Sequence, residues 1–502
     1  MTTALVHPDS AAPPAAADPP PPETAALAAA ARAAQREWAT APLRRRLAVV
    51  RGIRHRLAAD PERFADAARA GRSDPRSEKL VGEVLPLADA CRFLESQAAS
   101  ILAPRRHGSS GRPMWLFGVT SEVRREPLGV VLLIAPSNFP LFLAGVQAAQ
   151  ALAAGNAVLW KPGLGGTASA EAFAEAAVAA GLDRRLLTVL PETAAAAQEA
   201  VDAGVDKVFL TGSARAGSAV MERLAATLTP SVMELSGCDP VFVLPEADPD
   251  LVARAVKSGL RFNGSETCIA PRRVFVPRPQ AADLETRLRA AAESIEARPV
   301  RPAAAAFAEA LVGEAVSAGA RRLTGRLADD PPGLLTPTVV ADVRPPMRLM
   351  REDVFAPVVS VCPVADADEA LRLAADCPYA LGASVFGPER AAVAFAARVR
   401  AGGVTVNDLV APTADPRLPF GGLGRSGFGV TRGPEGLLEM TVPRVVAVRR
   451  GSYQHLEEPT PGDAEFFAAY IRAAHSPGWF ARLGWAARLV RLATRRMWGG
   501  GS

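Results

Sequence analysis

The chain has 502 residues, of which 49% are hydrophobic and 22% are charged, which predicts a soluble globular protein with two large lobes and smaller attachments. The net charge of +5 is small for this length, and without a recognition motif it argues against a nucleic-acid-binding protein. No apolar run approaches the ~20 residues of a membrane-spanning helix and no secretory signal is recognisable, so we expect a cytoplasmic protein.

The N-terminal part of the chain divides into a leader, a helical region and an arm. Residues 1–22 are rich in proline and alanine without periodicity and are predicted to be a disordered leader. From residue 23 to about 102, apolar residues recur at steps of three and four, which predicts helices. The runs MWLFG (residues 114–118) and SEVRREP (residues 121–127) are predicted to be short strands that pair as an arm.

Apolar runs then alternate with alanine-rich helical stretches in two successive regions. Between residues 129 and 237 the predicted strands are GVVLLIAP, AVLWKP, LLTVLP, KVFLTG and VMELSG. From about residue 251 to 407 they are RRVFV, VVSVCPV, GASVF and GGVTVN. Continuous apolar strands with helices between them are typical of parallel β-α-β units that are covered on both faces. The expected fold class is therefore α/β.

The C-terminal part combines a glycine-rich segment, a strand and a helical tail. Residues 419–429 are too rich in glycine for a helix or a strand, so an ordered loop is predicted before a last strand at residues 444–450. Over residues 463–498 a basic amphipathic helix is predicted, with apolar residues on one side and arginines on the other. Such a helix either lies in a membrane surface or packs on its own protein or a sister subunit.

Polar residues follow the strands of the first region, where α/β proteins bind their ligands. These strand ends supply Asn138, Lys161, Gly212, Ser213, Gly217 and Glu234. Most of them have a plainer interpretation, as turn formers, exposed charges or helix-packing glycines. Glu234 resists this interpretation, because a carboxylate that follows a buried strand without a task would destabilise the fold.

Cysteine and lysine are scarce enough to inspect one by one. The cysteines are odd in number and show no C-x-x-C or Cys/His ligand spacing, so neither disulfides nor a metal site is expected. Cys268, in the segment FNGSETC, is either a nucleophile or a buried packing residue. The lysines are Lys79, Lys161, Lys207 and Lys257.

The segment from Glu126 to Gly163, EPLGVVLLIAPSNFPLFLAGVQAAQALAAGNAVLWKPG, resembles the aldehyde dehydrogenase superfamily almost residue by residue. The later segments VFLTGSARAG, MELSG, FNGSETCIA, REDVFAPV, GGVTVND and PFGGLGRSGFG follow in that family's order. The resemblance covers roughly residues 25 to 450, and ordered agreement of this kind is highly specific.

This resemblance implies an enzyme that oxidises an aldehyde to the carboxylic acid with a nicotinamide cofactor. Cys268 is then the nucleophile that forms a hemithioacetal, and Asn138 with the backbone N–H of Cys268 forms the oxyanion hole. Glu234 is the general base that activates water to hydrolyse the thioester. A long-chain or otherwise apolar aldehyde is one expectation for the substrate, because such aldehydes partition into a membrane surface.

The resemblance also assigns the cofactor, NAD or NADP, with NAD slightly favoured. The residues it implies are Lys161 at the adenine ribose, Gly212, Ser213 and Gly217 at the pyrophosphate, Leu235, and Asp353 and Phe355 around the nicotinamide. Several positions depart from the family. Leu164 replaces the acidic residue that usually grips the adenine ribose, which leaves NADP open. Ser265 replaces a glycine before the nucleophile and could alter the path of its loop.

The family's architecture implies a Rossmann-like NAD(P)-binding domain, a second α/β catalytic domain and a small β oligomerisation arm. We expect the NAD(P)-binding domain at residues 23–113 and 126–235 and the catalytic domain at residues 236–407. The oligomerisation arm, together with an active-site loop, is expected at residues 114–125 and 408–450, and a tail follows at residues 451–502. A homodimer or homotetramer is expected. Two other functions stay open, an acylating enzyme that passes the thioester to coenzyme A and a non-catalytic, membrane-associated scaffold. The presence of Glu234 weighs against the acylating enzyme.

Overall fold

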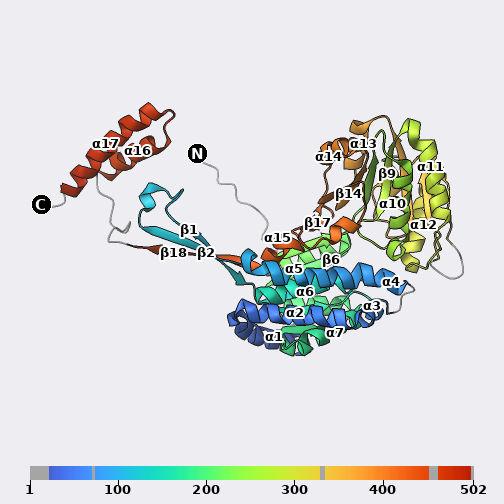
Figure 1. The fold of residues 1–502 in the computed structure, drawn as a ribbon, viewed down its shortest axis with the longest axis horizontal. Helices are drawn as coiled ribbons and strands as arrows, with labels where there is room; N and C mark the ends of the chain where they lie inside the picture. The colour runs from blue at the N-terminus through green and yellow to red at the C-terminus, as the bar shows by residue number, and fades with distance from the viewer. Residues whose placement is uncertain (1–21, 71–73, 328–333, 451–461, 499–502) are drawn as a thin grey trace, which may run out of the picture. The chain divides into compact units, whose positions relative to one another are not determined.

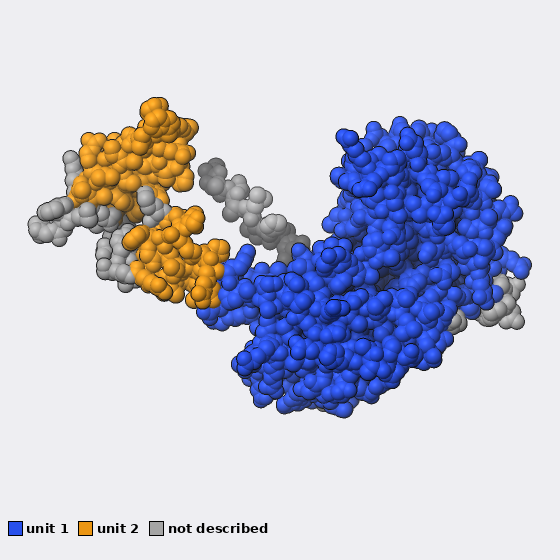
Figure 2. Space-filling view, in the orientation of Figure 1, with its two compact units in different colours: residues 1–105, 123–445 blue, residues 106–122, 446–502 orange. Residues whose placement is uncertain are grey.

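The computed structural model describes residues 22–70, 74–327, 334–450 and 462–498. These residues form two compact units, drawn in different colours in Figure 2. Unit 1 comprises residues up to 105 together with 123–445, and unit 2 comprises residues 106–122 together with those after 445. The predicted leader lies outside the described residues except for Pro22, which begins the first helix.

The first sheet of unit 1 has six strands in the order β17-β7-β6-β3-β4-β5. Their bounds are β3 Val130–Ile134, β4 Ala157–Lys161, β5 Leu187–Val189, β6 Lys207–Gly212, β7 Ser231–Leu235 and β17 Gly427–Phe428. All neighbours are parallel except β17, which pairs antiparallel with β7. The central strand β3 is buried along its whole length, as its continuous apolar run predicts.

Helices alternate with these strands along the chain and cover the sheet. They are α6 Phe142–Ala154, α7 Thr167–Ala179, α8 Ala194–Asp202 and α9 Ala214–Ala225. The N-terminal helices form a further layer, in which α2 packs on α5, α6 and α7 (Figure 1). This layer consists of α1 Pro22–Thr40, α2 Leu43–Ala59, α3 Pro61–Ala67, α4 Arg76–Lys79, a π-helix Leu80–Val84 and α5 Leu85–Ile101. The helices predicted between residues 23 and 102 are therefore present.

The second sheet of unit 1 has seven strands in the order β10-β11-β12-β9-β8-β14-β15. Their bounds are β8 Asp239–Val243, β9 Pro271–Pro277, β10 Arg321–Arg322, β11 Thr338–Ala341, β12 Val358–Val364, β14 Gly382–Phe386 and β15 Gly403–Val406. Successive residues of β9, Val274 and Phe275, belong to different hydrophobic clusters. Each face of this sheet therefore has its own core.

Helices α10 Pro249–Arg261, α11 Arg278–Glu293, α12 Pro302–Ser317, α13 Ala367–Ala375 and α14 Glu389–Ala396 surround the second sheet (Figure 1). Two sheets of mostly parallel strands with helices between them confirm the α/β class. Strands β8, β10 and β11 extend the set that the sequence predicted. In β8, Pro240 interrupts the apolar pattern and the register shifts between Asp239 and Pro240.

A third sheet, β1-β2-β18, forms the arm. It consists of β1 Arg105–His107, β2 Val119–Pro127 and β18 Thr441–Arg449. The strand predicted for MWLFG is wrong, because Met114–Leu116 is a 3-10 helix in which the Leu116 N–H donates to the Pro113 carbonyl at 3.0 Å. Trp115 and Phe117 are exposed, so no apolar layer holds this run extended. The predicted final strand is confirmed as β18.

The predicted tail helix is two helices, α16 Asp463–His475 and α17 Trp479–Trp498, which pack on each other within unit 2. Ser476 ends the first helix and Gly478, with φ of +80°, allows the chain to turn before the second. Arg488 of α17 pairs with Glu465 of α16 at 2.6 Å. None of the described helices has both the length and the apolar character that crossing a bilayer requires.

Candidate active site

Two cavities of unit 1 meet at the predicted nucleophile and base. One has a volume of about 270 Å³ and an apolar lining, and the other has a volume of about 370 Å³ and a more polar lining. Leu143, Glu234 and Cys268 line both of them. The Cys268 thiol and the Glu234 carboxylate can thus be reached from both cavities. Such an arrangement lets two ligands, one in each cavity, meet at these two residues.

Cys268 is half-buried and follows a short, strained turn. Asn263, Gly264 and Ser265 have φ of +53°, +63° and +61°, a run of left-handed residues of which only one is a glycine. The buried guanidinium of Arg272 stabilises this path by donating to the hydroxyl of Ser265 at 3.0 Å and to its carbonyl at 2.8 Å. Serine at this position therefore does not prevent the loop from presenting Cys268.

The electrostatic surroundings of Cys268 oppose ionisation of its thiol. Burial raises the pKa of Cys268 well above its usual value, and the negative charges of Glu234 and Asp239 raise it further. The positive charge of Arg432 acts in the opposite direction. A thiolate therefore forms here only with the help of a nearby cation or base.

Glu234 lies on β7 and is only 2% exposed. Its Oε2 accepts a hydrogen bond from the Thr431 hydroxyl at 3.3 Å, whereas Oε1 is buried without a hydrogen-bond partner. Burial raises the pKa of Glu234, and the positive charge of Arg432 is the largest opposing influence. A carboxylate with a raised pKa and one free oxygen is suited to accept a proton near neutral pH.

The glycine-rich segment, residues 419–429, lies beside β7, the strand that carries Glu234. The prediction that residues 419–429 contain no strand is wrong, because they contain β16 Leu423–Gly424 and β17. Gly427 lies opposite Glu234 in the β17–β7 pair, and a Cβ on Gly427 would lie only 1.9 Å from the Met233 carbonyl oxygen. Glycine thus allows two backbones to approach closely and brings Thr431 and Arg432 to the base.

Asn138 lies after β3 and is buried close to the Cys268 loop. Its amide Nδ2 donates to the Glu266 carbonyl at 3.0 Å, which leaves one amide N–H of the side chain available. Asn263 donates to the Asn138 carbonyl at 3.1 Å, and Lys79 in turn donates to Asn263 Oδ1 at 2.7 Å. The asparagine predicted for the oxyanion hole is therefore fixed to the nucleophile loop by a buried network.

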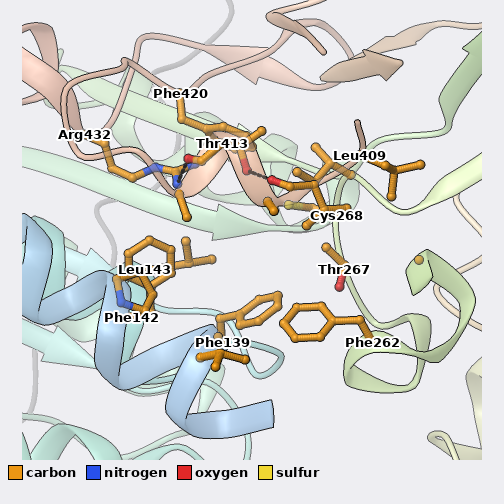
Figure 3. A pocket seen from close by; sticks show the side chains of 18 of the residues that line it. Phe139, Phe142, Leu143, Phe262, Thr267, Cys268, Leu409, Thr413, Phe420 and Arg432 are labelled. Atoms are coloured by element: carbon orange, nitrogen blue, oxygen red, sulfur yellow. Dashed lines mark hydrogen bonds between the residues drawn. The ribbon is translucent and has the colours of Figure 1, made fainter. Parts of the chain in front are cut away.

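The smaller cavity is lined mainly by apolar side chains (Figure 3). The rings of Phe139 and Phe262 lie together on one side of it, with centroids 6.1 Å apart. On the opposite side lie Phe420, Thr413 and the guanidinium of Arg432. Such a lining suits an apolar molecule whose polar end reaches Cys268.

The larger cavity collects most of the predicted cofactor residues. Its lining includes Asn138, Lys161, Gly212, Ser213, Leu235, Asp353 and Phe355. Gly217 is not among the lining residues; it packs in α9, where an added Cβ would lie 2.9 Å from the Leu235 side chain. The Ser213 hydroxyl caps α9 by accepting from the Ala216 N–H at 3.2 Å, so the helix N-terminus faces this cavity.

Asp353 offers the clearest sign that the larger cavity accepts a polyhydroxylated ligand. Its Oδ1 is buried without a hydrogen-bond partner, and burial raises the pKa of this carboxyl. A ribose hydroxyl is a donor that such an oxygen lacks. The residues that line this cavity, among them Lys161, Ser213, Asp353 and Phe355, therefore fit a dinucleotide.

Leu164 lies on the rim of the larger cavity near Lys161 and is 73% exposed, so residue 164 supplies no carboxylate there. Glu192 is the nearest acidic influence on Lys161, but its oxygens accept from the backbone N–H groups of Gly165 and Thr167 at 2.8 and 2.9 Å. Arg301 lines the same cavity with its guanidinium 5.8 Å from the centre of the Phe355 ring.

Several functional residues were not predicted from the sequence. Arg432 and Arg301 line the cavities, and Thr431 donates to Glu234, all from segments whose patterns carry no motif of their own. Lys79 had one usable signal, its scarcity in an arginine-rich chain. In the described part of the chain, no cluster of three or more His, Cys, Asp or Glu side chains could hold a metal ion.

A model of the aldehyde dehydrogenase family matches residues 16–446. A protein of Mycobacterium tuberculosis named "Putative succinate-semialdehyde dehydrogenase (NADP(+)) 2" is 32% identical over 437 residues, which cover 84% of this chain and 83% of that protein. The 4,4'-diapolycopene aldehyde oxidase of Methylomonas sp. is 28% identical, and the match covers 81% of this chain and 78% of that protein.

Solved structures agree over most of the chain. The NADP-dependent glyceraldehyde-3-phosphate dehydrogenase of Bacillus halodurans, complexed with NADP, has a TM-score of 0.79 and 30% identity, covering 85% of this chain and 91% of that one. An aldehyde dehydrogenase of Mycobacterium tuberculosis, complexed with NAD+, has a TM-score of 0.79 and 26% identity, covering 86% and 91%.

Proposed function

The chain belongs to the aldehyde dehydrogenase family and is therefore an oxidoreductase that acts on aldehydes with NAD or NADP, and from this premise we propose the course of its reaction. It oxidises an uncharged, apolar aldehyde to the carboxylic acid through a thioester on Cys268 that water hydrolyses with Glu234 as general base. The observation that carries this proposal is that Cys268 and Glu234 line both the apolar cavity and the polar one.

The first step joins Cys268 to the substrate. The Cys268 thiol releases its proton to solvent, the thiolate sulfur attacks the aldehyde carbon to form a C–S bond, and the carbonyl electron pair moves to oxygen. The remaining N–H of the Asn138 amide and the backbone N–H of Cys268 stabilise that oxyanion. Bound in the polar cavity, the nicotinamide of NAD or NADP supplies the acceptor for the hydride. The loss of hydride converts the hemithioacetal into a thioester.

The second step releases the acid. Glu234 removes a proton from a water molecule as its oxygen attacks the thioester carbon, and the C–S bond then breaks to return the Cys268 thiolate. The free Oε1 of Glu234 supports this role, because it is buried and has no partner of its own. It also weighs against an acylating enzyme, since a base that activates water competes with transfer to coenzyme A.

The lining of the smaller cavity supports an apolar substrate. Phe139, Phe142, Phe262, Ile269 and Leu409 surround the approach to Cys268. The Methylomonas relative is named a 4,4'-diapolycopene aldehyde oxidase, and for this chain we propose a long, apolar aldehyde. A second candidate is an aldehyde with a carboxylate at its far end, as in the name of the mycobacterial relative; the presence of Arg432 in the lining favours it.

Substitution of Cys268 and Glu234 tests the proposed reaction. Cys268→Ala should abolish the formation of reduced cofactor with an uncharged aliphatic aldehyde, whereas Cys362→Ala, which changes a buried cysteine of β12, should leave it intact. Glu234→Gln should give one round of cofactor reduction and then stall, with the mass of the acyl group retained on the protein. Full turnover by Cys268→Ala with NAD and NADP would overturn the proposal, and release of the Glu234→Gln acyl group as a coenzyme A thioester would favour the acylating enzyme.

The arm and tail support two further proposals. Val442, Val445 and Val448 are exposed along β18, and we propose that this strand takes part in a homodimer or homotetramer. For α16 and α17 we propose peripheral contact with an anionic membrane surface from a cytoplasmic location. The division into cofactor-binding, catalytic and oligomerisation parts at the boundaries given above likewise remains a prediction.

A further inference from the structure

Arg432 is a charged side chain in the apolar cavity, and the reaction steps proposed at Cys268 and Glu234 do not use it. Among the residues that line the apolar cavity, only Glu234 and Arg432 carry a formal charge at neutral pH. Arg432 is 5% exposed, and arginine is rarely buried to this extent without a partner. Its position therefore needs an explanation in terms of what it faces.

The backbone at Arg432 has an unusual conformation that fixes the direction of the side chain. Its φ is +62° and its ψ is 175°, a conformation that residues with a side chain rarely adopt, and Gly433 after it also has a positive φ of +61°. This bend directs the Arg432 side chain into the cavity at the start of α15 Gly433–Glu439.

The guanidinium is fixed by its neighbours on two sides. Its central carbon lies 4.1 Å from the centre of the Phe420 ring and 5.5 Å from that of Phe142. One amino group donates to the Thr413 carbonyl at 2.6 Å. The Nε atom is buried without a hydrogen-bond partner. These contacts orient the charge but include no carboxylate within ion-pair distance in the described part of the chain.

The anion that this charge faces is Glu234. Thr431, the residue before Arg432, donates to Glu234 Oε2, so the same bend of the chain brings both residues to the base. Arg432 is the largest influence that opposes the raised pKa of Glu234, and Glu234 is the largest that opposes the lowered pKa of Arg432. In a cavity with apolar walls, water screens this attraction weakly.

We propose that Arg432 is a positioning residue that keeps the Glu234 carboxylate ionised in an apolar pocket, and that it does not recognise a carboxylate on the substrate. A substrate carboxylate placed there would also face Glu234, which already balances the charge of Arg432. One amino group of the guanidinium is already engaged by the Thr413 carbonyl, so it is not free for two-point capture of a substrate carboxylate. This inference rests on the proposed role of Glu234 and narrows the substrate class to uncharged aldehydes.

The test is the pH dependence of the two half-reactions in the full-length protein. Cys268 also faces Arg432, together with Glu234, Asp239 and Asp353, so the burst of reduced cofactor is measured apart from steady-state turnover. Because Arg432 favours the charged form of Glu234, Arg432→Met should move the acid limb of turnover to higher pH by about one unit or more. Arg432→Lys keeps the charge and should recover most of that shift.

Controls separate this role from a structural one and from substrate recognition. Arg432→Gly removes the charge and suits the positive φ, so it should fold even if Arg432→Met does not, and it should show the same shift. Arg425→Met changes an exposed arginine of the glycine-rich segment and should leave the profile unchanged. The aldehydes to compare are octanal and succinic semialdehyde.

Two results would overturn the inference. One is an unshifted acid limb for both Arg432→Gly and Arg432→Met. The other is a KM that rises tenfold or more for succinic semialdehyde alone, which would assign Arg432 to substrate recognition. Neither result touches the proposed course of the reaction, which fails only if Cys268→Ala turns over or Glu234→Gln does not stall; the second result would favour the carboxylate-bearing substrate.

Discussion

At the scale of single residues, we expect Leu164 to influence the choice between NAD and NADP. It is exposed three residues after Lys161, on the rim of the polar cavity. A carboxylate at this position would accept hydrogen bonds from the adenine-ribose hydroxyls of NAD and repel the 2'-phosphate of NADP. We expect Leu164→Glu to lower kcat/KM with NADP roughly tenfold and to raise it with NAD, as steady-state kinetics with each cofactor would measure.

The matched control for this prediction is Leu164→Gln, which has a similar shape and no charge. It should change the ratio of the two activities much less than Leu164→Glu does. If both variants shift the ratio equally, shape rather than charge governs the choice, and the absence of an acid at residue 164 says nothing about NADP.

The residues that the sequence could identify are those whose chemistry is local. Glu234 lies on the buried strand β7 and Cys268 lies in a recognisable segment, so both could be proposed as site residues without coordinates. Arg432 could not, because its role depends on a left-handed bend and on a strand pair that joins residues almost two hundred positions apart. The concern over Ser265 was equally undecidable, since Arg272 supports that turn from within β9.

At the scale of elements, α4 controls the nucleophile loop through Lys79. The ammonium of Lys79 is buried, donates to Asn263 and lies 3.4 Å from an oxygen of Asp74. Asn263 in turn holds Asn138 and the left-handed turn before Cys268. Lys79→Met should reduce the free energy of unfolding by about 3 kcal/mol, because it leaves Asp74 without this cation. It should also lower kcat by at least tenfold, because the oxyanion hole loses its support.

Chemical denaturation and burst kinetics would measure the two effects. Lys257→Met offers a control, because Lys257 lies on α10 outside both cavities. If Lys79→Met is destabilised but its kcat is unchanged, the network supports the fold and not the geometry of Asn138. An unchanged stability would instead mean that the buried ion pair contributes little.

The elements that the sequence predicted well are those with an uninterrupted pattern. The apolar runs of β3, β4 and β6 required no knowledge of their neighbours, since strands buried on both faces are apolar throughout. MWLFG has the composition of a strand, but no sheet receives it, and Pro113 favours a turn instead. The short strand β17 is the converse case, a glycine pair that is a strand only because β7 lies beside it.

At the scale of the whole molecule, unit 2 exposes the kind of surface that a bilayer accepts. Trp479 and Phe480 of α17 are 63% and 72% exposed, and Leu483 and Val490 are exposed as well. Helix α17 contains arginines and no acidic residue. Arg472 of α16 and Arg488 of α17 both lie over the Trp485 ring, a contact that joins the two helices.

Flotation with liposomes tests this surface on the complete protein. Aromatic side chains at the headgroup level and arginines near anionic lipid each favour binding, at about 1 kcal/mol per arginine near the surface. We therefore expect the chain to float with vesicles that contain anionic lipid and to float less as salt is raised.

Deletion of residues 460–502 should abolish flotation while activity toward a soluble aldehyde persists. The double substitution of Trp479→Ser and Phe480→Ser should weaken vesicle binding at least tenfold. Arg482→Gln should weaken binding to anionic vesicles only. If the deletion floats as well as the complete chain, α16 and α17 do not mediate the membrane contact.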